Sequence, residues 1–79
     1  MDTVRLRLSN RLAVPRTVTI EPWTGEIVLE PGQIVTLISR GDLTYAMELE
    51  LTEDGAVFYA FDNAGAMVRI YDADGKELF

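Results

Sequence analysis

The stretch that decides the fold of this 79-residue chain is "MELELTEDGAVFYAF", residues 47–61. Glu48 and Glu50 alternate with apolar residues, an acidic turn signal follows, and a second alternating run then contains no basic residue. A period of two is typical of strands with one buried face, and glycine after acidic residues is typical of a tight turn. The stretch therefore predicts a β-hairpin with glutamates on one face.

The length of the turn sets the register of this hairpin. If residues 53–55 form a three-residue turn with Gly55 in the left-handed conformation, Glu50 lies opposite Phe58. The predicted core face then consists of Tyr45, Met47, Leu49, Leu51, Val57, Tyr59 and Phe61.

Two further turn signals, at residues 62–65 and 73–75, extend the hairpin into a C-terminal meander of three to four strands. The predicted pairs are Tyr59 with Val68, Val57 with Ile70, Ile70 with Leu78, and Asp72 with Lys76. The outer face of the meander would hold Glu48, Glu50, Phe58, Met67, Arg69, Tyr71, Glu77 and Phe79. A slip of one residue would reverse this choice of face, and the N-terminal strands could instead cover it.

The rest of the chain also consists of short segments typical of strands. "TVRLRLS" (3–9) and "TVTIE" (17–21) alternate, whereas "QIVTLIS" (33–39) is apolar on both faces and is expected to be a central strand. No segment keeps a helical period. The sequence predicts one all-β domain over residues 1–79, a small antiparallel sandwich or partly open barrel of about seven or eight short strands.

The amino-acid composition excludes several kinds of catalytic and metal-binding site. The chain contains neither cysteine nor histidine, so disulfides, thiolate metal sites and a histidine general base are excluded. The stretch "DADGKELF" (72–79) is similar to the start of a calcium loop, but its glycine comes too early, so a hairpin turn is expected there. Alternating glutamates on an open strand suit acid–base catalysis poorly. We expect a protein that is not an enzyme and needs no metal or cofactor.

The net charge of −6 is unevenly distributed, with +3 over residues 1–16 and −7 over residues 41–79. An acidic body repels nucleic acid and anionic lipid and attracts basic surfaces. Neither a signal peptide nor a membrane span is expected, so the predicted location is the cytoplasm. Solubility alone is the alternative explanation of the charge.

The stretch "TVTIEPWTGEIVLEPGQIVTL" (17–37) resembles a pattern in short, uncharacterised bacterial β-proteins: a strand ending in Glu-Pro-Trp-Gly, a second strand, Leu-x-Pro-Gly and a third strand. The matching positions are Val18, Ile20, Glu21, Pro22, Trp23, Leu29, Pro31 and Gly32. Thr24 intrudes between Trp23 and the glycine that usually follows it in the pattern. The resemblance implies an all-β fold and no particular activity.

These observations predict a non-catalytic protein-binding module, with a phage-type, anti-CRISPR-like inhibitor of a basic or nucleic-acid-binding protein as its specific form. One alternative is a structural module that uses the same face, or a sheet edge, to form a homodimer. Another is a sugar-binding domain using Trp23 and Tyr59, although Trp23 could instead cap one end of the core. The residues predicted to bind the partner are Glu48, Glu50, Phe58, Arg69, Tyr71, Glu77 and Phe79.

Overall fold

A computed structural model describes residues 2–42, 46–60 and 65–79 of the chain. These residues form seven strands and no helix, so no described helix is long and apolar enough to cross a membrane. The strands are β1 (Asp2–Ser9), β2 (Arg16–Glu21), β3 (Gly25–Leu29), β4 (Ile34–Gly41), β5 (Glu48–Leu51), β6 (Gly55–Tyr59) and β7 (Met67–Tyr71).

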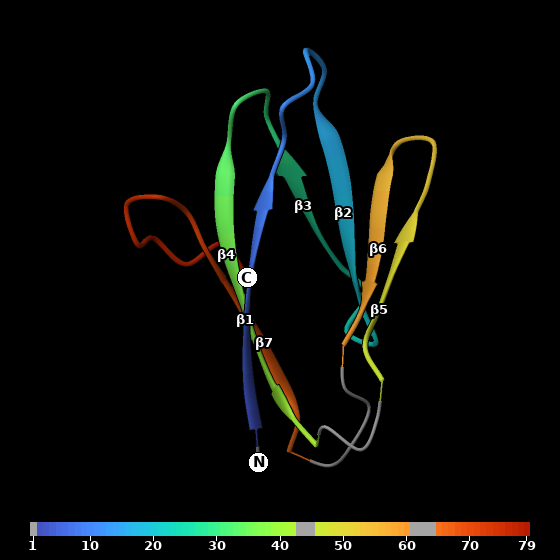
Figure 1. The fold of residues 1–79 in the computed structure, drawn as a ribbon, viewed down its shortest axis with the longest axis vertical. Helices are drawn as coiled ribbons and strands as arrows, with labels where there is room; N and C mark the ends of the chain where they lie inside the picture. The colour runs from blue at the N-terminus through green and yellow to red at the C-terminus, as the bar shows by residue number, and fades with distance from the viewer. Residues whose placement is uncertain (1, 43–45, 61–64) are drawn as a thin grey trace.

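The seven described strands divide into a three-stranded sheet, in the order β1-β4-β7, and a four-stranded sheet, in the order β3-β2-β6-β5 (Figure 1). The prediction of an all-β sandwich is confirmed. The sequence predicted antiparallel pairing throughout, but β2 and β6 are parallel. The four-stranded sheet is therefore mixed.

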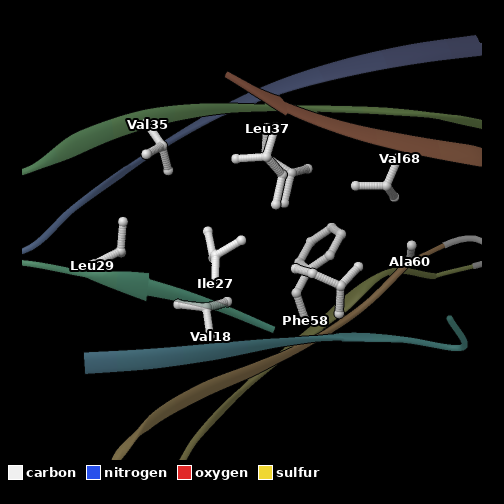
Figure 2. Close-up of a cluster of buried hydrophobic side chains, with 10 residues drawn as sticks. Val18, Ile27, Leu29, Val35, Leu37, Phe58, Ala60 and Val68 are labelled. Carbon is white, nitrogen blue, oxygen red and sulfur yellow. The ribbon is translucent and has the colours of Figure 1, made fainter. Parts of the chain in front are cut away.

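The core lies between the two sheets, whose inward side chains point toward one another (Figure 2). Removing this much apolar surface from water is the main stabilising contribution to a domain of this size. From the three-stranded sheet come Val35, Leu37, Val68 and Ile70. From the four-stranded sheet and the residue after β6 come Val18, Ile20, Ile27, Leu29, Phe58 and Ala60.

The prediction of a C-terminal meander is wrong, because β5 and β6 belong to one sheet and β7 belongs to the other. Strand β6 lies between β5 and β2, whereas β7 pairs with β4. The expected pairs of Tyr59 with Val68 and of Val57 with Ile70 therefore do not form. The physical reason is that β1 and β4 alone would make a two-stranded sheet, which is only marginally stable until a third strand widens its apolar face.

The register of β5 with β6 also differs from the prediction by one residue. Leu49, rather than Glu50, lies opposite Phe58, and two residues, Glu53 and Asp54, lie between the hydrogen-bonded Thr52 and Gly55. The Gly55 N–H donates to the Thr52 hydroxyl at 3.1 Å, and the Thr52 N–H donates to the Gly55 carbonyl at 3.0 Å. A one-residue slip exchanges the two faces of a strand. Phe58 is consequently 2% exposed, and Tyr59, predicted to be in the core, is 38% exposed.

The C-terminal turn agrees with the prediction. The Leu78 N–H donates to the Ile70 carbonyl at 2.7 Å, and the Asp72 N–H donates to the Lys76 carbonyl at 2.9 Å. Gly75 has a φ of 83°, and the Asp72 carboxylate accepts the N–H groups of Asp74 and Lys76. The stretch is thus a hairpin turn closed by its own aspartate.

Strand β5 faces the core as predicted but is poorly covered. Leu49 and Leu51 are 47% and 81% exposed, because β5 is the outermost strand of the wider sheet. Tyr45 and Phe61, also predicted to be in the core, lie outside the described residues.

Candidate binding faces of the sandwich

The outer surface of the four-stranded sheet is acidic. Two rows of side chains cross it: in the first, Tyr59 lies between Glu48 and Glu21, and in the second, Val57 and Thr19 lie between Glu50 and Glu26. Among the outward positions of these four strands there is no lysine or arginine. We call this surface the glutamate face; its members are Glu21, Glu26, Glu48, Glu50, Thr19, Val57 and Tyr59.

Tyr59 lies in a groove of about 530 Å³, which Glu21, Glu48, Pro22 and Ala46 also line. Its hydroxyl donates a hydrogen bond to the Glu50 carboxylate, at 3.3 Å. The negative charge of Glu50 is the main cause that raises the pKa of Tyr59 above 10.0, and partial burial, the Glu50 hydrogen bond and the charges of Glu48 and Glu21 add to the effect. The groove therefore combines an aromatic ring with several carboxylates.

A second groove, of about 550 Å³, continues along the same face and shares Thr19 and Val57 with the first. Glu26 and Asp54 line it, and Arg16 lies at its end. The Arg16 guanidinium donates to the Glu53 carbonyl at 2.7 Å. This arginine belongs to the turn end of the face, away from the row that contains Tyr59.

The opposite outer surface, on the three-stranded sheet, is basic. Arg5 and Arg69 lie on either side of Ile38 in one row across the sheet, and Arg7 and Arg40 lie in the neighbouring rows. Glu77 contacts Arg69, with 3.8 Å between the Oε1 and Nε atoms, and both side chains are half-exposed. We call this surface the arginine face; its members are Arg5, Arg7, Arg40, Arg69, Ile38, Tyr71 and Glu77.

The predicted binding residues are divided among three places. Glu48 and Glu50 belong to the glutamate face, and Arg69, Tyr71 and Glu77 belong to the arginine face on the other side of the sandwich. The expectation that Phe58 is exposed on the same surface is wrong, since it is buried in the core. The Phe79 ring packs against Gly25 and the core. The seven residues therefore do not share one surface.

Sequence reasoning missed five of the seven members of the glutamate face, among them Glu21, Glu26 and Tyr59. Glu21 and Glu26 do alternate with buried Ile20 and Ile27, which marks them as outward-facing. Only the parallel pairing of β2 with β6, however, brings Glu21 beside Tyr59. No local signal encodes that pairing, because the two strands are far apart in the sequence.

Trp23 and Tyr59, the pair considered for sugar binding, line different grooves. Trp23 is 42% exposed and lines a crevice of about 270 Å³ with Met67, Arg69 and Phe79. Thr24, the next residue, has a φ of 57°, in the left-handed region that glycine occupies most easily. The residue that intrudes between Trp23 and Gly25 is thus held in a conformation unusual for a threonine.

Comparisons with protein-family models, with curated proteins and with solved structures give no match to this chain. The resemblance to short bacterial β-proteins therefore stays a prediction.

Proposed function

We propose that this protein is a non-catalytic binding module whose glutamate face docks on a basic surface of another protein. The observation that carries the proposal is the clustering of four glutamates around Tyr59 and Val57, with no cation among the outward positions of the four described strands. An uncompensated acidic face attracts basic partners at long range and disfavours acidic ones.

The groove beside Tyr59 suits an arginine side chain of the partner. Glu48 and Glu21 lie one strand away from Tyr59 on either side, so their backbones are about 10 Å apart. A planar guanidinium placed between them could stack on the ring and pair with a carboxylate at its edge. Pro22 and Ala46 would contact the aliphatic part of the arginine.

Proteins that bind nucleic acid have grooves lined with arginine and lysine, which is the kind of surface that the glutamate face would bind. The specific form of the proposal is therefore a phage-type, anti-CRISPR-like inhibitor that occupies such a groove. It would act in the cytoplasm, without a cofactor, and the net charge of −6 argues against direct binding of nucleic acid or membranes. The arginine face lies on the opposite side of the sandwich and would stay free.

An arginine-rich peptide is a direct probe of this proposal. Titration into the labelled protein should shift the NMR signals of Thr19, Val57 and Tyr59, with an affinity that falls steeply as salt rises. Glu21→Gln and Glu48→Gln should each weaken binding about two- to fivefold, the range expected for exposed ion pairs. Glu30→Gln is the matched control, because Glu30 is an exposed glutamate in the β3–β4 turn.

Peptide-induced shifts confined to other surfaces would contradict the proposal. So would an equal loss of affinity in Glu30→Gln, which would indicate that only the net charge matters.

A further inference from the structure

One side of the sandwich is open and lined with leucines. Strands β1 and β5 are edge strands, one of each sheet. Leu8 of β1 and Leu49 of β5 line a shared crevice of about 180 Å³, together with Leu12 from the β1–β2 connection. Leu6 and Leu51 are the neighbouring residues on the inner faces of the same two edge strands. We call the crevice together with these two residues the leucine cleft; its members are Leu6, Leu8, Leu12, Leu49 and Leu51.

The leucines of β1 and β5 point inward but remain in contact with water. Leu6 lies opposite buried Leu37, and Leu49 lies opposite buried Phe58, so both belong to the inner face of their strands. Yet Leu6, Leu12, Leu49 and Leu51 are all exposed. Edge strands with unpaired backbone groups beside exposed apolar side chains are surfaces that proteins usually cover.

The connection that carries Leu12 is held in place rather than free to fold over the cleft. The buried Asn10 amide donates to the Leu29 carbonyl at 2.9 Å and to the Val14 carbonyl at 2.8 Å. Its side-chain oxygen accepts the Leu12 N–H at 2.9 Å. The cleft is therefore a preformed surface.

We infer that a second copy of the chain covers the leucine cleft, with β1 of each copy beside β5 of the other around a two-fold axis. Such an arrangement uses the β1 and β5 edges of both copies and closes on itself. It extends each three-stranded sheet into the partner's four-stranded sheet, and it joins the two clefts into one apolar core.

Charge complementarity favours the pairing of β1 with β5 over the pairing of either strand with its own copy. The outward residues of β1 include Arg5 and Arg7, and those of β5 are Glu48 and Glu50. Pairing β1 with β1, or β5 with β5, would place like charges beside each other, which is destabilising across strands. Pairing β1 with β5 places arginines beside glutamates outside and leucines beside leucines inside.

Stacking the glutamate face of one copy on the arginine face of the next is the competing arrangement. It would leave the leucines in water, and its head-to-tail geometry would not close, so it would grow into open-ended chains. The dimer inference does not rest on the proposed function, although both use Glu48 and Glu50. In the dimer these two carboxylates lie beside Arg5 and Arg7 of the other copy, and Glu21, Glu26 and Tyr59 stay accessible on the glutamate face.

The test is the molar mass in solution, measured by sedimentation equilibrium over a wide range of protein concentration at low and high salt. We expect a monomer–dimer equilibrium that persists at high salt, because apolar burial contributes most of the affinity. Leu51→Lys should weaken dimerisation about tenfold or more, since it places a charge in the cleft. Ile34→Lys is the control: Ile34 is an exposed apolar residue on the outer face of β4, and its replacement should leave the dimer unchanged.

A charge exchange tests the orientation. Arg5→Glu with Arg7→Glu should weaken the dimer, and adding Glu48→Arg with Glu50→Arg should restore it. Thermal unfolding of every variant verifies that the fold is retained.

Three outcomes would overturn the inference: a monomer at every concentration, assembly beyond the dimer that salt dissolves, or a dimer unaffected by Leu51→Lys. The second of these would indicate stacking of the two charged faces.

Discussion

Tyr59 donates a hydrogen bond to Glu50 across the β5–β6 pair, with 3.3 Å between the oxygen atoms. The two residues lie diagonally on the outer face, since Glu50 is directly opposite Val57. This contact is possible only in the observed register, because the predicted one would place Tyr59 in the core. It therefore links the acidic groove to the strand pairing that creates it.

The first prediction concerns the titration of Tyr59. Its pKa should lie above 10.0, chiefly because the negative charge of Glu50 disfavours the tyrosinate. The folded state then favours the neutral phenol, so this contribution to stability is present below pH 10 and is lost as the pH rises through the raised pKa. NMR titration of the Tyr59 ring measures the shift.

Glu50→Gln should lower that pKa, and Glu77→Gln, on the opposite face, should leave it unchanged. A Tyr59 ring that titrates at or below 10.0 in the native protein would contradict the proposed contact.

The second prediction tests which face of β6 is buried. Phe58→Ala should lower the free energy of unfolding by about 3 to 5 kcal/mol, because it empties a core site. Tyr59→Ala should cost less than about 1 kcal/mol, as expected for an exposed position. Urea denaturation measures both, and the pair Phe58→Leu and Tyr59→Leu gives the same comparison if Phe58→Ala does not fold. A larger loss at Tyr59 than at Phe58 would restore the register predicted from the sequence.

The third prediction concerns Asn10, a buried residue in the β1–β2 connection. Asn10→Ala removes three side-chain hydrogen bonds and leaves the buried Leu29 carbonyl without its amide donor, which should cost about 2 to 4 kcal/mol. Gln33→Ala is the comparison, since Gln33 makes one exposed bond to the Glu30 N–H and should cost about 1 kcal/mol or less. Equal losses at the two positions would show that burial of Asn10 has no special effect.

The fourth prediction concerns the left-handed Thr24. Thr24→Gly should raise the free energy of unfolding by about 0.5 to 1 kcal/mol, because it removes the steric cost of a β-branched residue at positive φ while adding chain entropy to the unfolded state. Gly75→Ala should have the opposite sign, since it places a Cβ at a φ of 83°. Thermal unfolding measures both, and destabilisation by Thr24→Gly would indicate that the threonine has a favourable role in this turn.

The sequence by itself determined the strand character of the chain and the C-terminal hairpin. Alternation with a period of two, and turn residues at short intervals, depend only on neighbours in the chain. The pairing of Ile70 with Leu78 is equally local, since a three-residue turn ending in left-handed Gly75 brings them together.

Only the tertiary structure decided which face of β6 is buried and which strands are neighbours. Strand β6 has apolar or aromatic residues on both faces, Phe58 on one and Val57 and Tyr59 on the other, so its pattern fits either orientation. The choice depends on the opposing three-stranded sheet, which itself needs β7 as a third strand. Glu21 and Tyr59 meet for the same reason: β2 and β6 become neighbours only when both sheets bury their apolar faces together.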